Sequence, residues 1–582
     1  MLPLDIYIAI LESVEPQRAE LDAVSTLVNC LKTNRLLHEA AARPGLWEAH
    51  YRVRYQHSNR DTEAELTTLF NDDWRLKYAE RRRRDREALA LLEQMVLDRE
   101  HRYEYAATLA VKSFDIWDAF EVECILPAPA LFGTSVTYAL TRRYWAEGVL
   151  NMILRSSAIK HWGGLVDGGN SVSFVDAFSS LSCFFGKSFQ EISSSLAALN
   201  EQCRMYLLKK SCEIDPESPG YNLSGLCTEI CHFMSEDQGF GPVESTRFYN
   251  VLNHFPHAYL DTNKKTLPIY LVHVFVSLAR SLGIPASPVE FPGRVLVHVA
   301  SPPGADDFMV DVFGSSLVSL RHDLPAMLLR LGIAPDNIER YVAPCGAAPM
   351  LLRAARNIFS SLQNSDSPSQ AAVYVTVCIH LLLSDEPQLV SHMLSRVPSL
   401  DPLYCSTFLA DMRPLLQGGN VRLLDKICAS VMETEKSEAA ALHLRTDDIK
   451  IAHYVGMTFK HRVYGYTGCI VGWDPVCAAS DEWKTLMQVG RLDRGADQPF
   501  YHVISLEGTQ RYVAEDNIAK PVELTAELAM LFLEQVSIMG RYFSDAYTHP
   551  EAYRGRWRLS PELQRQYPND EDAARKYDDY PE

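Results

Sequence analysis

The chain has 582 residues with a net charge of −18 at neutral pH; 47% of the residues are hydrophobic and 22% are charged. This composition is ordinary for soluble globular protein, and the length predicts three or four domains rather than a single core. The acidic excess disfavours a protein that mainly coats phosphate backbones. The longest apolar runs fall short of the roughly 20 residues that a membrane-spanning helix needs, so we expect no membrane contact.

The cysteines and the first residues of the chain indicate the cellular compartment in which the protein is expected. The 13 cysteines contain no Cys-x-x-Cys pair, and the nearest cluster, Cys227, Cys231 and His232, lacks a second pair of ligands. We therefore expect free buried thiols in a reducing compartment, no metal site and no cofactor. The start carries Asp5 and no basic stretch, so no secretion signal is predicted. These features predict a cytoplasmic or nuclear protein.

Residues 1–55 are predicted to form a small module of three helices. Pro3 suits the first turn of a helix, and Ile6 and Ile10 lie four residues apart on one face. A second stretch with helical spacing follows, a third ends near Ala41, and Pro44-Gly-Leu-Trp47 closes the module. The same residues would also suit the core of a plain helical domain.

This pattern resembles the F-box, a three-helix module that docks on a Skp-type adaptor and so joins a cullin ubiquitin ligase. The resemblance implies a set of adaptor-binding residues in which the last two lock the third helix: Leu2, Pro3, Ile6, Ile10, Leu11, Leu46 and Trp47. Residues 56–215 are predicted to be a helical region. Its basic run, Arg81-Arg-Arg-Arg-Asp-Arg86, has acidic neighbours and is predicted to be a solvated helix face.

Residues 216–345 are predicted to hold a helix that starts near Pro268 and ends at Gly283, followed by two strands. The first strand follows Pro292-Gly-Arg294, and the second carries Asp311. This order resembles the transglutaminase-like domain of the SirB type, whose superfamily uses a Cys, a His and an Asp in that chain order.

The residues at those three positions are Tyr270, Arg294 and Asp311, so only the Asp keeps its type. His298 lies four residues along the strand from Arg294 and could substitute as a base. Without a nucleophile the triad cannot run its covalent chemistry, so we predict a pseudoenzyme without catalytic residues. An active enzyme with an unrecognised nucleophile is the alternative.

Residues 346–448 are predicted to be helical and possibly solenoid-like, and residues 523–582 to be a helix with a partly disordered tail from Gln564. Between them, residues 449–522 contain short strands rich in glycine and aromatic residues. Their pattern from Met457 to Asp474 resembles the YccV/HspQ family, small β-barrels associated with hemimethylated DNA and with protease adaptors. We expect a recognition surface formed by His461, Tyr464, Tyr466, Trp473 and Tyr501.

The charge of the predicted barrel distinguishes between DNA and protein as its binding partner. Residues 451–522 carry seven Lys and Arg against eight Asp and Glu, so little affinity for phosphate is expected from counterion release. Binding of a protein is therefore favoured over binding of DNA.

The predicted fold is multidomain and mainly α, with an α+β transglutaminase-like middle domain and a small C-terminal all-β, SH3-like barrel. The predicted function is that of a substrate-recognition subunit of a Skp–cullin–F-box ubiquitin ligase, which is an adaptor and not itself an enzyme. Its expected partners are a Skp-type adaptor, a cullin and an unknown target protein. A chromatin-associated DNA binder and a transglutaminase-like or protease-like enzyme are the alternatives.

Overall fold

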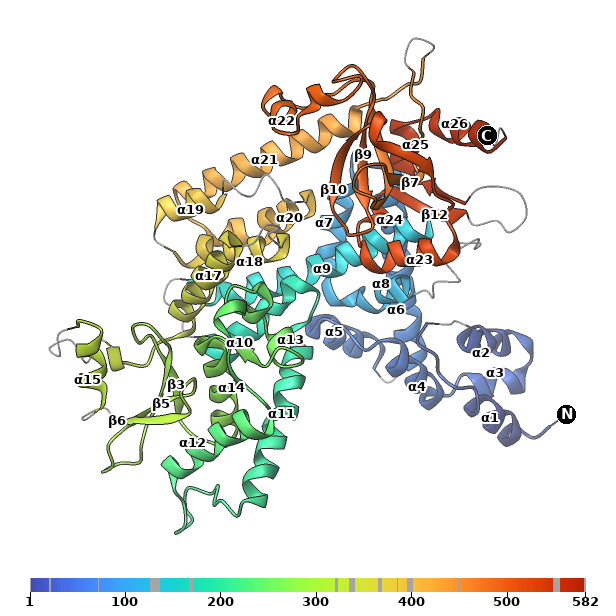
Figure 1. Cartoon of the computed structure of the whole chain (residues 1–582). Helices are drawn as coiled ribbons and strands as arrows, with labels where there is room; N and C mark the ends of the chain where they lie inside the picture. The colour runs from blue at the N-terminus through green and yellow to red at the C-terminus, as the bar shows by residue number, and fades with distance from the viewer. Residues whose placement is uncertain are drawn as a thin grey trace. The chain divides into compact units, whose positions relative to one another are not determined.

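The chain folds into two compact units in a computed structural model (Figure 1). Residues 1–153 together with 433–582 form the first unit, and residues 154–432 form the second. The predicted helical region 56–215 therefore contributes to both. Within the part of the chain that the structure describes, no helix is both long enough and apolar enough to cross a membrane. The described residues are 2–19, 22–71, 73–125, 137–166, 171–319, 323–333, 341–364, 369–384, 386–394, 401–446, 450–547 and 555–579.

Helices form the N-terminal part of the first unit. They are α1 (Leu4–Glu12), α2 (Asp22–Thr33), α3 (Arg35–Ala41), α4 (Pro44–Arg54), α5 (Arg60–Phe70), α6 (Trp74–Leu97), α7 (Arg102–Lys112), α8 (Trp117–Ile125) and most of α9 (Ala139–Gly163). The segment from Pro44 does not close a three-helix module as predicted. It begins a fourth helix, because proline is well tolerated at the first helical position, where its missing N–H would have no partner.

The basic run on α6 corrects a second expectation. Arg83 is solvent-exposed as predicted, but Arg81 is fully buried. Its guanidinium donates to the backbone carbonyl of His57 at 2.8 Å and lies over the ring of Tyr55 at 4.5 Å. Arg81 therefore ties α6 to its neighbours, and only part of the run is a solvated face.

The C-terminal part of the first unit is built around a five-stranded antiparallel sheet of order β10-β9-β8-β7-β11. The elements of this part are the end of α21 (Gly419–Ala440, of which residues 433–440 belong to this unit), β7 (Thr458–His461), β8 (Thr467–Asp474), α22 (Asp481–Leu486), β9 (Phe500–Ser505), β10 (Gln510–Ala514), β11 (Ile518–Pro521), α23 (Ala526–Gln535), α24 (Met539–Tyr542), β12 (Phe543–Tyr547), β13 (Arg556–Leu559), α25 (Pro561–Gln566) and α26 (Asp570–Asp579).

The segment after Gln564 is largely helical as far as Asp579. α26 carries the fully buried Asp570, whose carboxylate accepts hydrogen bonds from Arg445 at 2.7 Å and from the backbone N–H of Val455 at 2.7 Å. The Trp473 indole donates to the same carboxylate at 3.2 Å. A few buried polar contacts thus hold a segment that is poor in aliphatic residues, and the disorder predicted for the end of the tail concerns residues 580–582, which lie outside the described residues.

The second unit combines helices with a four-stranded antiparallel sheet of order β3-β4-β5-β6. Together with the first unit, it confirms the predicted mainly α fold with an α+β middle and a C-terminal β region. Its elements are α10 (Phe174–Ser179), α11 (Phe189–Lys209), α12 (Leu223–His232), β1 (Gly241–Pro242), α13 (Pro256–Tyr259), β2 (Lys265–Thr266), α14 (Pro268–Ser281), β3 (Ala286–Val289), β4 (Leu296–Val299), β5 (Phe308–Asp311), β6 (Ser316–Ser319), α15 (Asp323–Arg330), α17 (Ala347–Gln363), α18 (Gln370–Leu383), α19 (Pro387–Leu394) and α20 (Pro402–Thr407).

Candidate functional site

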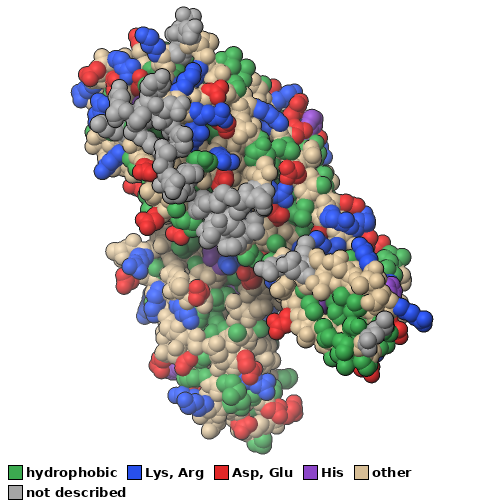
Figure 2. All heavy atoms as spheres, turned by 90° about the vertical axis from the view of Figure 1, so that its right-hand side faces the viewer, with side chains coloured by type: hydrophobic (Ala, Val, Ile, Leu, Met, Phe, Trp, Pro, Cys, Tyr) green, Lys and Arg blue, Asp and Glu red, His purple; other side chains and the backbone are tan. Residues whose placement is uncertain are grey.

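Helix α1 presents an apolar row to solvent. Leu2, Ile6 and Ile10 recur every four residues and are 48%, 43% and 49% exposed, and Pro3 beside them is also exposed. Figure 2 faces this side of the chain and shows hydrophobic side chains gathered over the N-terminal helices. Ile6 and Ile10 on α1 (Leu4–Glu12), together with Leu2 just before the helix, form an apolar surface that a partner can cover.

The other predicted adaptor-binding residues lie in the core behind this row. Leu11, Leu46 and Trp47 are buried in one cluster with Leu27 of α2. The Trp47 indole donates to the backbone carbonyl of Ala41 at 2.6 Å, which holds α4 against α3. Leu11 is buried and does not offer the exposed contact with an adaptor that was predicted for it, and Leu46 and Trp47 lie in the packing between α4 and its neighbours.

Of the three positions that correspond to the transglutaminase triad, Tyr270 makes one set of contacts, and Arg294 and Asp311 make another. Tyr270 lies in the first turn of α14 and is fully buried. Its hydroxyl pairs with Nδ1 of His254 at 2.8 Å, and Nε2 of His254 pairs with Ser361 Oγ at 2.7 Å. Burial lowers the pKa of His254 to about 3 and raises that of Tyr270, so both side chains stay neutral in a sealed network.

The side chains at the other two triad positions, Arg294 and Asp311, contact each other. Arg294 lies just before β4, and its Nη1 donates to Oδ2 of Asp311 at 2.5 Å. The Gly314 N–H donates to the other carboxylate oxygen at 3.1 Å. Arg294 and Asp311 thus form an ion pair, and a guanidinium stays protonated and cannot accept a proton from a nucleophile.

His298 does not take over as the base at Asp311. It lies on β4, where its Nε2 contacts Oδ2 of Asp307 at 3.1 Å. Asp307 precedes β5, whereas Asp311 ends that strand. The predicted substitution by His298 is therefore wrong, because this histidine is paired with a different carboxylate.

The thiol of Cys231 on α12 lies close enough to Asp311 for the charge of that carboxylate to affect the pKa of the thiol. It is buried and lines a cavity of about 170 Å³ with Leu271 and Phe313. The pKa of this thiol is raised to about 12, mainly by burial and to a smaller extent by Cys227 and Asp311. An activated thiol nucleophile needs the opposite shift.

We expect Cys231 to resist alkylation in the folded chain. Treatment with iodoacetamide at pH 7.5, read by mass spectrometry, should leave this thiol unmodified for hours, because only a minute fraction is thiolate. The same thiol should react within minutes once the chain is unfolded in urea, which serves as the internal control. Alkylation of folded Cys231 faster than that of the unfolded chain would instead reveal an activated nucleophile.

One cluster of possible metal ligands within the described residues consists of His57, Asp118 and Glu121. Nη2 of Arg18 contacts the Asp118 carboxylate at 3.2 Å and also contacts Glu121. A guanidinium already supplies the positive charge that these carboxylates require, so the cluster is an ion-pair network.

The barrel keeps only part of the predicted recognition surface exposed. Tyr464, in the turn between β7 and β8, is 75% exposed, and Tyr466 is half-buried beneath the Arg511 guanidinium at 4.4 Å. His461 is buried, and its Nδ1 accepts the backbone N–H groups of Val463 and Tyr464 at 3.2 and 3.1 Å. It shapes the turn instead of meeting a partner.

Trp473 and Tyr501 were also predicted to lie on the recognition surface, but the structure buries both side chains. Both are buried in the core that joins the barrel to the C-terminal helices. The Trp473 indole donates to Asp570, and the Tyr501 hydroxyl donates to Glu515 at 2.6 Å. Their polar atoms therefore have partners inside the protein, and the two rings stabilise the fold.

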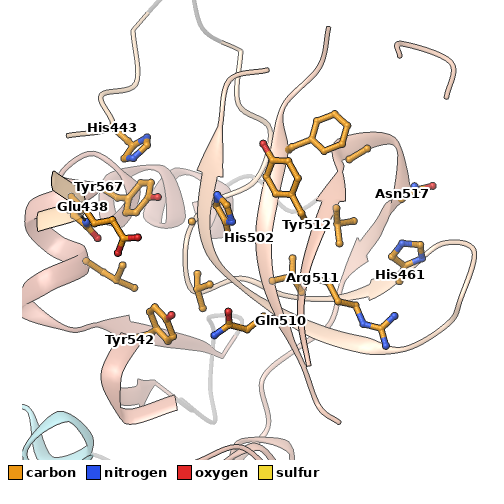
Figure 3. Close-up of a pocket in the computed structure, with 18 of the residues that line it drawn as sticks. Glu438, His443, His461, His502, Gln510, Arg511, Tyr512, Asn517, Tyr542 and Tyr567 are labelled. Carbon is orange, nitrogen blue, oxygen red and sulfur yellow. Dashed lines mark hydrogen bonds between the residues drawn. The ribbon is translucent and has the colours of Figure 1, made fainter. Parts of the chain in front are cut away.

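A cavity of about 880 Å³ lies beside the sheet and contains residues that the sequence did not single out. Figure 3 shows His443 and Tyr567 at one end, Arg511 and His461 at the other, and His502 and Tyr512 between them. The sequence of β10, Gln-Arg-Tyr-Val-Ala, does not alternate between polar and apolar residues and gave no signal for the cavity.

One carboxylate orders the middle of this cavity wall. Gly472, His502 and Tyr512 are direct neighbours across β8, β9 and β10. Asp474 accepts hydrogen bonds from His502 at 3.1 Å and from the Tyr512 hydroxyl at 2.7 Å. Burial alone would raise the pKa of Asp474, but these two donors hold it below its ordinary range. The ionised carboxylate thereby fixes two aromatic rings, an arrangement suited to binding a partner.

Two segments of the chain match known protein families. Residues 451–548 match the family described as "Hemimethylated DNA-binding protein YccV like", and residues 190–356 match the "Transglutaminase-like superfamily". Both predicted resemblances are confirmed; the transglutaminase-like match extends beyond both predicted ends of its domain, and the YccV-like match extends beyond the predicted C-terminal end only. No solved structure matches the chain.

Three curated relatives of this chain share one name. "F-box only protein 21" of Pongo abelii is 27% identical over 335 residues, which cover 51% of this chain and 48% of that protein. The proteins of the same name from Mus musculus and Homo sapiens are each 27% identical over 339 residues, 51% of this chain and 49% of theirs. The alignment spans about half the length of these relatives. The chain thus carries a transglutaminase-like region followed by a YccV-like region and is similar to F-box only protein 21 over half its length.

Proposed function

We propose that this chain is the substrate-recognition subunit of a Skp–cullin–F-box ubiquitin ligase. The observation that carries the proposal is the exposed row of Leu2, Ile6 and Ile10, formed by α1 and the residues just before it, with α1 packed on the core through Ile8 and Leu11. The name of the relatives, which contains the term F-box, supports it. In this role a Skp-type adaptor covers the row and links the chain to a cullin, and the chain works in the cytoplasm or the nucleus.

The later domains then hold a target protein and do no chemistry themselves. The proposal of a degenerate triad is supported by the ion pair of Arg294 with Asp311 and by the sealed contact of Tyr270 with His254. The mechanism is proximity, because binding raises the concentration of the target near a ubiquitin-loaded enzyme. Ubiquitination then marks the target for proteasomal degradation.

The barrel is proposed to bind protein and not DNA. Its lysines and arginines do not outnumber its carboxylates, and Arg494 is paired with both Glu515 and Asp516 at 3.0 and 2.9 Å. Cations engaged in this way release few counterions from a phosphate backbone.

The proposal can be tested by affinity purification from cells with the proteasome inhibited. The wild-type chain should recover adaptor and cullin, and the variant with Leu2→Ala and Pro3→Ala should recover far less of both. Proteins bound by both chains should carry fewer ubiquitin remnants with the variant, since they remain bound but are no longer modified. Equal recovery of adaptor and cullin by both chains, or recovery by neither, would contradict the proposal.

A further inference from the structure

Strand β10 is an end strand of the barrel sheet, and its pairing with β9 shows which of its backbone groups face outward. The N–H of Ser505 donates to Thr509, and the N–H of Glu515 donates to the carbonyl of Pro499. In an antiparallel pair the bonded residues alternate, so the odd-numbered residues of β10 bond to β9. The N–H and C=O groups of Gln510 and Tyr512 therefore point away from the sheet.

These outward groups are free to bind. In the described part of the chain no backbone hydrogen bond to another strand involves Gln510 or Tyr512 on their outer side. Gln510 is exposed and Tyr512 is partly exposed, and the whole of β10 lines the cavity of about 880 Å³ (Figure 3). Two donors and two acceptors are thus available in the alternating order of a strand edge.

Strand β10 has few of the features by which proteins protect an open strand edge against pairing with another chain. A charged side chain that projects over the edge usually blocks pairing with another chain. Here Arg511 is drawn over the ring of Tyr466 at 4.4 Å, and proline is absent from the strand. The edge thus stays open beside a cavity.

The rim of the cavity supplies apolar contacts next to this edge. Tyr464 is 75% exposed and Met487 is 55% exposed, and both line the cavity together with the half-buried Trp483. Exposed aromatic and methionine side chains around a pocket are typical anchors for a peptide. Backbone pairing would give the register, and these side chains would give selectivity.

We propose that the edge of β10 binds an extended segment of the target protein as an added strand, an inference that rests on the proposed function. An extended polypeptide presents N–H and C=O groups at alternate residues, which is the pattern that Gln510 and Tyr512 complement. Nucleic acid lacks this pattern and would need a cationic surface that residues 451–522 do not have.

The experiment uses the purified full chain and a phage-displayed library of random 12-residue peptides. A selected peptide is synthesised in a series with one N-methyl group at each position, and binding is measured by fluorescence anisotropy. Methylation should weaken binding at every second residue by about fivefold or more and leave the residues between unaffected. A flat profile, a library that yields no binder, or displacement of the peptide by a DNA duplex overturns the proposal.

Two variants at one position provide the matched comparison. Gln510→Pro removes one outward N–H while keeping the bonds to β9, because proline is tolerated where the N–H faces away from the sheet. It should weaken peptide binding by about fivefold, whereas Gln510→Ala should bind as the wild type does. Equal binding by both variants, with unchanged melting temperatures, also overturns the proposal. Adaptor binding by Gln510→Pro should equal that of the wild type, so a failed strand addition and a failed ligase assignment give different results.

Discussion

The variant that combines Ile6→Asp with Ile10→Asp is expected to lose more than about 100-fold in affinity for a Skp-type adaptor. Each isoleucine is a little under half exposed, so burial of its exposed part contributes roughly half of the 1.5–3 kcal/mol that full burial of such a side chain contributes. An aspartate at the same place would have to leave water without a partner, which costs at least about 1 kcal/mol more. Two substitutions therefore remove roughly 3 kcal/mol or more of binding free energy.

The fold should survive this change, because both side chains face solvent while Ile8 and Leu11 hold α1 in the core. Val111→Asp on α7 is the matched control, since it places the same charge at an aliphatic side chain that is 80% exposed. Surface plasmon resonance with immobilised adaptor measures all three chains. Similar affinity for the α1 variant and the Val111→Asp control would show that α1 is not the binding surface.

The substitution Glu562→Gln is expected to destabilise the first unit by about 3–5 kcal/mol. The Glu562 carboxylate is buried and contacts Arg99 at 2.9 Å and Arg102 at 2.6 Å. Burial alone would raise its pKa, but Arg102, Arg541 and Arg99 overcome this effect and hold the pKa below its ordinary value. A neutral amide of the same shape would remove the carboxylate that Arg102 contacts and leave Glu435 to balance the charges of Arg99 and Arg541, which it contacts at 2.8 and 3.6 Å.

The loss is measured by hydrogen exchange in increasing urea, on peptides that cover α6 and α25. Glu48→Gln is the control: its partner Arg52 is exposed on the same helix, so the change should stay within about 0.5 kcal/mol. Because the folded pKa of Glu562 is lowered, its contribution is present above its ordinary value of 4.5 and is lost as the pH falls through the folded value. The difference between wild type and Glu562→Gln should therefore shrink in acid, and a difference that stays constant would exclude the charge as its cause.

The local elements of the transglutaminase-like region could be predicted from sequence because their signals are local. Proline at the first position and glycine after the last turn predicted α14 almost to the residue, and Gly283 does adopt a φ of +77°. The strand that carries Asp311 was predicted in the same way. The pairing of His298 with Asp307 could not be predicted, because strand register and loop path decide which carboxylate a side chain meets.

Burial of the aromatic residues in the barrel had no local signal. Trp473 finds its hydrogen-bond acceptor in Asp570, which lies 97 residues later in the chain. The contact between Arg102 and Glu562 joins residues 460 positions apart. A polar group such as an indole N–H suggests an exposed side chain as long as its distant hydrogen-bond partner is unknown. The partner of Trp473 lies in the C-terminal tail, part of which was expected to be disordered, so the burial of Trp473 could not be predicted.

The most direct test of the proposed function is a calorimetric titration of the purified chain with a purified Skp-type adaptor. The exposed α1 row predicts one site per chain with a dissociation constant below about 1 µM, the equivalent of roughly 8 kcal/mol of binding free energy. Heat of binding that disappears in the variant with Ile6→Asp and Ile10→Asp would support the ligase assignment. No binding by the wild-type chain at about 50 µM, where a site of that strength would be nearly saturated, would contradict it.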